Sequence, residues 1–131
     1  MIQIRFPLCY STWNVKKLIP EDCPHCADNL LYFYHWFLFK DSNVKVGLYS
    51  SYEDFIISSF YLNMNSSAFK DYLLFSSTFI YDSFPDRFKR FFVNGTSHCV
   101  SNYNYIIHNI SIYNWINGMI ENSSDWQDLM E

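Results

Sequence analysis

Apolar residues form two patterns in the first half of the chain that predict β-strands. Residues 2–6 alternate between apolar and polar and end at Pro7, as a short half-buried strand does. Residues 30–39 are apolar or aromatic on both faces, which is typical of a central strand. Residues 44–49 alternate again after a turn at 40–43, so we predict a β-hairpin rich in aromatic rings.

Start signals predict two helices in the second half of the chain. Ser83 and Pro85 favour a helix start, and aromatic residues then recur along one face as far as residue 94. Ser111 precedes a segment, 112–120, whose apolar residues recur at i, i+3, i+4, i+7 and i+8. We therefore predict helices over 83–94 and 112–120.

The other segments complete the predicted fold class. Residues 52–62 fit either a strand or a helix, and residues 69–81 favour a strand. We also predict a short helix at 11–18, a loop at 20–28, a strand at 106–110 and a last helical turn at 125–131. Together these elements predict an α+β fold, in which an antiparallel β-sheet with a central aromatic hairpin has helices packed on one side.

Composition limits the class of protein. The chain has 131 residues, 50% of them hydrophobic and 17% charged, which predicts one globular domain over 1–131. A net charge of −4 argues against nucleic-acid binding, which needs many Lys and Arg contacts to phosphate. The longest apolar run is too short to cross a bilayer. We expect a soluble cytoplasmic protein with reduced thiols and no membrane contact.

Charge is distributed unevenly along the chain. Every Lys and Arg lies at or before Arg90, and the chain ends in acidic residues on a background that is 21% aromatic. One interpretation is a solvated acidic end that only aids solubility. The functional interpretation is a surface that binds a basic protein partner, with acidic residues for steering and a ring as anchor. Its predicted residues are Glu121, Asp125, Trp126, Asp128 and Glu131.

Cys23-Pro24-His25-Cys26 is the sharpest local motif, and three interpretations remain open. Its inner dipeptide resembles that of thioredoxin-like oxidoreductases, in which the first thiol is reactive. The Cys-x-x-Cys spacing also suits zinc, with His98 and Cys99 (or Cys9) as further ligands. The third interpretation is an ordinary surface turn, with the other cysteines in the core. We predict no cofactor and no metal.

Catalytic signatures are absent from the sequence. It has no nucleophile elbow, P-loop or zinc-protease motif. His35 lies in an apolar run, where a core histidine is the more common finding. The carboxylates of Glu21-Asp22 and of Glu53-Asp54 are adjacent and would diverge on a strand. We therefore predict that the protein is not an enzyme and has no catalytic residues.

The order of three aromatic segments resembles the immunity proteins of contact-dependent growth inhibition and related polymorphic-toxin systems. These segments are residues 7–13, the run 35–41, and residues 110–115 before the last predicted helix. The resemblance implies a small acidic cytoplasmic protein that neutralises a cognate toxin domain, often a nuclease, by covering its basic active-site surface. The alternatives are a small zinc-stabilised protein of a virus or mobile element and a thiol oxidoreductase acting through Cys23 and Cys26.

Overall fold

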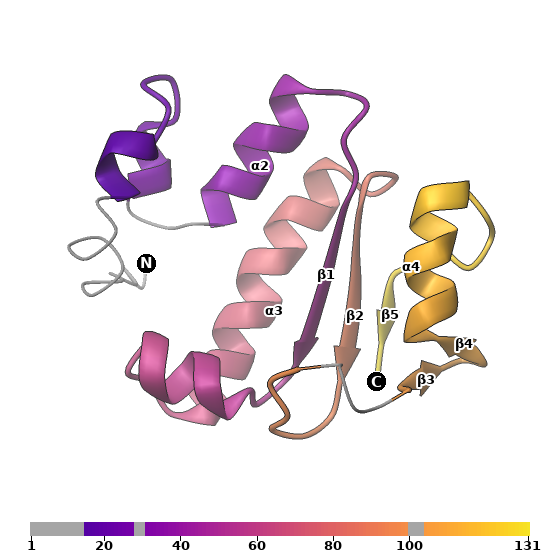
Figure 1. The fold of residues 1–131 in the computed structure, drawn as a ribbon. Helices are drawn as coiled ribbons and strands as arrows, with labels where there is room; N and C mark the ends of the chain where they lie inside the picture. The colour runs from indigo at the N-terminus through magenta and orange to yellow at the C-terminus, as the bar shows by residue number, and fades with distance from the viewer. Residues whose placement is uncertain (1–14, 28–30, 100–103) are drawn as a thin grey trace.

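The structure is a computed structural model that describes residues 15–27, 31–99 and 104–131 (Figure 1). Its helical elements are η1 (Val15–Leu18), η2 (Pro24–Ala27), α2 (Leu31–Lys40), η3 (Ile56–Tyr61), α3 (Ser66–Ser83) and α4 (Ile112–Glu121). Its strands are β1 (Val46–Ser51), β2 (Phe88–Val93), β3 (Ile106–Ile107), β4 (Ile110–Ser111) and β5 (Leu129–Met130). The strand predicted at 2–6 lies outside the described residues, as does the first part of the predicted helix at 11–18.

The main sheet is parallel, so the predicted antiparallel sheet is wrong. Its strand order is β1-β2-β5, and β2 pairs in parallel with both neighbours. Val46 lies opposite Phe88 at one end of the β1-β2 ladder, and Ser51 lies opposite Val93 at the other. The sheet found to be antiparallel is the two-residue pairing of β3 with β4.

The predicted aromatic hairpin does not form, because its first half is a helix. Residues 31–40 make α2, and Leu31, His35 and Leu38 follow the i, i+4, i+7 spacing of one helix face. Leu38 is fully buried with residues of α3 and β2. Arg87 closes the helix end by donating from its guanidinium to the carbonyl oxygens of Leu38 and Asp41, both at 2.8 Å. A run that is apolar on every face fits either a strand or a helix. Here the packing of the helix on its neighbours decides between the two.

The segment at 69–81, for which a strand was favoured, belongs to helix α3. Asn65 caps this helix, since its side-chain oxygen accepts a hydrogen bond from the backbone nitrogen of Ala68 at 2.8 Å. Phe69, Leu73 and Ile80 are buried on one side of the helix, at the 3.6-residue period. The ambiguous segment at 52–62 contains η3, a six-residue π-helix.

The helix predicted at 83–94 is wrong, because residues 88–93 form the central strand β2. Pro85 lies in a turn in which the amide of Phe88 donates to the carbonyl of Phe84 at 2.8 Å. Five of the six residues of β2 are buried. The helical turn predicted at 125–131 is also wrong, because its last residues form β5.

The sheet is covered on both faces, rather than on one as predicted. Phe88 and Phe92 of β2 pack with buried residues of α2 and α3, whereas Phe91 and Val93 pack with residues of α4 and β5. Figure 1 shows α2 and α3 to one side of the strands and α4 to the other. The β1-α3-β2 and β2-α4-β5 connections run the same way across the sheet over opposite faces, so they have opposite hands. One of them departs from the usual right-handed rule.

The prediction for 112–120 is confirmed. Ser111 caps α4, since its hydroxyl accepts a hydrogen bond from the backbone nitrogen of Asn114 at 3.1 Å. Ile112 and Trp115 are buried against the sheet. The strand predicted at 106–110 is a tight hairpin instead, because His108 and Asn109 adopt φ values of 48° and 66°.

Gly118 allows the C-terminal segment to pack directly on α4. A Cβ at this position would lie 2.8 Å from the backbone nitrogen of Trp126, which is closer than real contacts allow. In open space, alanine would stabilise a helix relative to glycine by roughly 0.5–1 kcal/mol. We expect Gly118→Ala to destabilise the protein by about 1–3 kcal/mol instead, through overpacking. Urea denaturation checks this, with the exposed Asn117→Ala as control, and a stabilised Gly118→Ala variant would contradict the packing.

Candidate functional site

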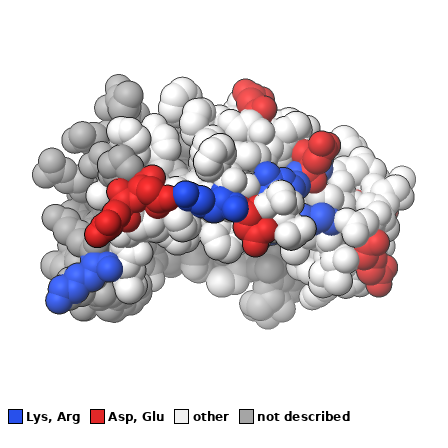
Figure 2. Space-filling view, turned by 90° about the horizontal axis from the view of Figure 1, so that it is seen from above, with Lys and Arg blue, Asp and Glu red and all other residues white. Residues whose placement is uncertain are grey.

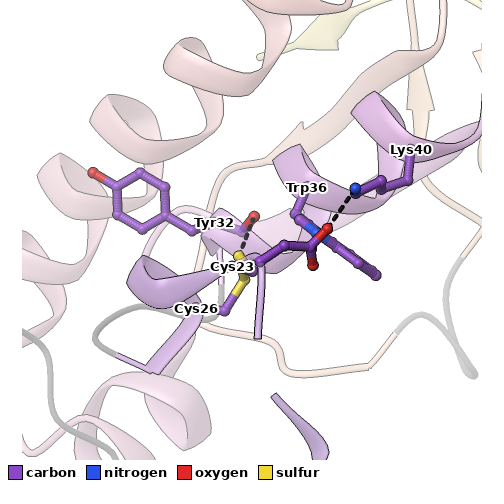
Figure 3. Close-up of a disulfide and its surroundings, with 6 residues drawn as sticks. Cys23, Cys26, Tyr32, Trp36 and Lys40 are labelled. Atoms are coloured by element: carbon purple, nitrogen blue, oxygen red, sulfur yellow. Dashed lines mark hydrogen bonds and ion pairs between the residues drawn. A yellow bond between two sulfur atoms is a disulfide. The ribbon is translucent and has the colours of Figure 1, made fainter. Parts of the chain in front are cut away.

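A disulfide between Cys23 and Cys26 closes a short turn beside α2 (Figure 3). Both cysteines are buried, Cys23 with 7% and Cys26 with 0% exposure. The sulfur of Cys23 lies 4.0 Å from the carbonyl oxygen of Tyr32 in α2. The amide of Cys26 donates to the carbonyl of Cys23 at 3.0 Å, inside the 3₁₀ turn η2. Residues 19–27 contain this turn and lie against α2, and we call them the clasp.

Asp22 provides a second link between the clasp and α2. Trp36 donates from its indole nitrogen to one carboxylate oxygen at 2.9 Å, and Lys40 forms an ion pair with the other oxygen. Figure 3 shows both side chains reaching from the helix toward the clasp. The hydrogen bond from Lys40, with that from Trp36, holds the pKa of the Asp22 carboxyl below its usual 3.8. The link is therefore present at neutral pH and is lost as the pH falls through that lowered pKa.

The side of α2 that faces away from α3 carries exposed rings. Phe33, Tyr34 and Phe37 are 36%, 38% and 41% exposed, and we call them the aromatic face. Phe33 and Phe37 stack with their ring centroids 6.4 Å apart. The ring of Phe33 also packs beside that of Trp36, with centroids 5.6 Å apart. At about 200 Å² per ring, the aromatic face exposes roughly 230 Å². That area suits the centre of an interface better than a whole one, which takes about 800 Å² per partner.

A small cleft lies between α2 and α3. Its volume is about 80 Å³, and its lining residues are Leu31, Tyr32, Phe75, Ser76 and Phe79. Ligand pockets typically have volumes of about 300–1,000 Å³, so this cleft is too small for a cofactor. It has room for little more than one apolar side chain.

The structure does not assemble the suggested zinc site. Cys23 and Cys26 are joined to each other, so neither offers a thiolate to a metal. His98 contacts Asp54 instead, and Cys99 has an exposed free thiol. Within the described ranges, no group of three or more His, Cys, Asp or Glu side chains could hold a metal ion.

The suggested oxidoreductase site lacks an accessible attacking sulfur. Reactive Cys-x-x-Cys motifs expose the first thiol at the start of a helix, where the helix dipole favours the thiolate. Here Cys23 is 93% buried, and the helical turn after it has only four residues. The disulfide also differs from the expectation of reduced thiols at these two positions. The burial of both cysteines suits a bond that fixes the turn of the clasp.

Asp128, one of the predicted partner-binding residues, is tied into the interior of the protein. Its carboxylate pairs with Arg90 of β2 at 2.6 Å, and the two side chains are only 12% and 5% exposed. It also accepts a hydrogen bond from the backbone nitrogen of Arg90 at 2.9 Å. The guanidinium lies over the ring of Tyr81, 4.7 Å from its centroid, and donates to the hydroxyl of Thr78 at 2.9 Å. This charge is neutralised internally and therefore cannot steer a partner.

The other predicted partner-binding residues do not form one patch with Asp128. Trp126 packs against Trp115 with their ring centroids 4.9 Å apart, on the core beneath α4. Glu131 accepts a hydrogen bond from the backbone nitrogen of Asn94 at 2.6 Å. Glu121 is exposed and Asp125 is partly exposed, and their contact with a partner stays a prediction. Figure 2 shows acidic and basic side chains interspersed on the face seen from above.

A buried carboxylate paired with a histidine was missed at the sequence level. Asp54 is 3% exposed, and one of its oxygens lies 2.9 Å from Nδ1 of His98. Its other oxygen accepts a hydrogen bond from the backbone nitrogen of Ile57 at 2.9 Å, at the start of η3. The His98 side chain is 38% exposed, whereas that of Asp54 is 4% exposed, so the pair joins a buried carboxylate to an imidazole at the surface. No short-range pattern links residues 44 positions apart, so the sequence held no signal for it.

Comparisons with known proteins do not supply a family. The chain matches no protein-family model, no curated protein and no solved structure. Among the described residues, no helix is long and apolar enough to cross a membrane.

Proposed function

We propose that this chain is a protein-binding module that docks through the aromatic face of α2. The observation that carries the proposal is the environment of α2, which is apolar on every side but packs on α3 along only one of them. Helices of this kind are normally buried. Exposed rings held in place by neighbours are the usual anchors of protein interfaces, because they bury large area at a small entropic cost.

The partner that we propose is a cognate toxin domain, whose active-site surface the module covers in the cytoplasm. This step rests on the resemblance to immunity proteins and on the small size and acidic charge of the chain. The charged residues beside the aromatic face support a basic partner only in part. Asp22 is acidic, but Lys40 already pairs with it. Binding should therefore depend more on ring burial than on charge steering.

The proposal predicts that a toxin domain is encoded beside the gene. The test co-expresses that domain with the protein and also titrates it against the protein. We expect the double variant Phe33→Asp/Phe37→Asp to bind roughly 100-fold more weakly, because two buried anchors are lost. It should fail to protect growing cells while keeping the circular dichroism spectrum of the native protein. The matched control is Tyr113→Asp, which changes a ring that is 55% exposed on α4. This variant should bind normally.

The same titration separates the aromatic face from the acidic C-terminal segment. Ring-driven docking predicts that the association rate changes little between low and high salt. A steep fall with salt, together with weak binding by Glu121→Lys or Asp125→Lys, would assign the contact to the acidic segment. Normal binding by Phe33→Asp/Phe37→Asp would reject the proposal.

A further inference from the structure

The clasp is a small unit attached to the rest of the protein through α2. Among the described elements, η2 makes its main contacts with α2. The described features that hold it there include the Asp22 link, the buried cysteines with the disulfide that fixes their turn, and the ring of His25, whose centroid lies 5.6 Å from that of Tyr32. A 3₁₀ turn of four residues has no stability of its own in water. The clasp therefore depends on its contacts with α2 and on the disulfide.

The Asp22 link is too weak to hold the clasp alone. The Asp22 and Lys40 side chains are 52% and 47% exposed, so solvent screens their ion pair. The disulfide makes the stronger contribution, because it removes conformations from the opened segment. In a cytoplasmic protein such a bond is more often a redox sensor than a permanent staple.

We propose that the Cys23–Cys26 disulfide is a redox switch, which holds the clasp on α2 when oxidised and releases it when reduced by a dithiol. Release frees the indole of Trp36 from Asp22, so the ring that packs beside Phe33 is no longer fixed by a hydrogen bond. The aromatic face then loses its fixed arrangement. This effect on docking rests on the proposed function, whereas the opening of the clasp does not.

The chemistry balances as a two-electron exchange. Both cysteines are buried in the closed clasp, so the dithiol reacts when the clasp opens transiently. Its thiolate then attacks the sulfur of Cys23, the more exposed residue of the two at 7% against 0%. A mixed disulfide forms, and Cys26 leaves as a thiolate that takes up a proton. The second thiol of the reductant then attacks the mixed disulfide and releases Cys23 as a thiol. The protein gains two electrons and two protons, and the dithiol becomes a cyclic disulfide.

Peptide mapping gives a direct reading of the redox state. Trypsin cleaves after Lys17 and Lys40, and the peptide 18–40 contains Cys23 and Cys26 but neither of the other two cysteines. Protein purified in air and then unfolded in guanidinium chloride should resist iodoacetamide at both positions, because unfolding exposes both sulfurs and only the disulfide then protects them. After dithiothreitol treatment both should be alkylated. Alkylation of both without any reductant would overturn the proposal.

Hydrogen exchange tests whether reduction opens the clasp. The amides of Cys23 and Cys26 donate to Pro20 and Cys23 carbonyls, both at 3.0 Å, and report on the turn. We expect dithiothreitol to speed their exchange roughly 20-fold, the factor that the chain-entropy model gives for so short a loop. Exchange in α3 should not change. The variant Cys23→Ala/Cys26→Ala should exchange rapidly with or without reductant.

Two further outcomes keep the proposal separate from the docking hypothesis. Unchanged exchange in the clasp after complete reduction would show a passive staple and overturn the switch, while leaving docking through the aromatic face untouched. If docking is also correct, reduction should weaken toxin binding by the native protein but not by Cys23→Ala/Cys26→Ala. Redox-insensitive binding combined with a clasp that opens would contradict the proposed control of docking.

Discussion

Replacing Asp128 with alanine should lower the free energy of unfolding by about 3–5 kcal/mol, although the sequence places this residue in an acidic tail. The loss is large because Arg90 would keep a buried charge without its partner. Its side chain is 5% exposed, and its guanidinium donates to both Asp128 oxygens, at distances from 2.6 to 3.2 Å. The backbone nitrogen of Arg90 would lose its acceptor as well.

Urea denaturation followed by circular dichroism measures this effect. Asp125→Ala is the control, and it should change stability by no more than about 0.5 kcal/mol if Asp125 is a surface residue. The double variant Arg90→Met/Asp128→Leu should be more stable than Asp128→Ala, since no charge then remains buried. Equal, small effects of Asp128→Ala and Asp125→Ala would mean that Asp128 belongs to the surface after all.

Replacing Phe92 with alanine should cost about 3–5 kcal/mol, the usual loss for a large aromatic side chain in a core. Phe92 is fully buried near the end of β2, the central strand of the sheet. Its ring meets that of Tyr52 edge-on, at an interplanar angle of 73° and with centroids 5.9 Å apart, and it packs with Phe69 and Leu73 of α3. The truncation would leave a cavity between the sheet and that helix.

Phe75→Ala on the same helix is the matched control for Phe92→Ala. Phe75 is 78% exposed, so its truncation should change the stability by less than about 1 kcal/mol. Thermal unfolding of the two variants gives the comparison. A small effect of Phe92→Ala would show that residues 88–93 are not the central strand, and would favour the helix that the sequence suggests there.

The sequence predicts those elements whose local signals agree with their packing. The helix after Ser111 has a cap residue and a clear 3.6-residue period, and both survive in the structure. The strand at 44–49 is largely confirmed as β1, since alternate residues face different helices. In these two segments the spacing of the apolar residues matches both the local secondary structure and the side that is buried.

The remaining elements depend on contacts that short-range patterns do not encode. Residues 31–40 are almost continuously apolar, and residues 88–93 are apolar except for Lys89 and Arg90, yet the first segment is a helix and the second a central strand. A strand buried on both faces shows no alternation, so periodicity does not separate it from a helix. Pro85, which favours a helix start in the sequence, lies in a turn, where proline is also common. Pairing with β1 and β5 then decides the strand.

The candidate site likewise combines features that the sequence shows with features that depend on long-range contacts. The Cys23 and Cys26 motif was evident from the sequence, but its burial beneath α2 was not. The acidic residues at the C-terminus were evident too, but Arg90 lies 38 positions from Asp128 and no local pattern joins them. The sequence does not reveal the aromatic face, because the strand predicted at 30–39 would place neighbouring rings on opposite faces.

Hydrogen exchange of the protein with and without the cognate toxin domain tests the central claim most directly. Docking through the aromatic face predicts slower exchange on binding in α2 and in the clasp beside it, with α4 unchanged. Protection confined to residues 112–131, with α2 exchanging as in the free protein, would contradict it.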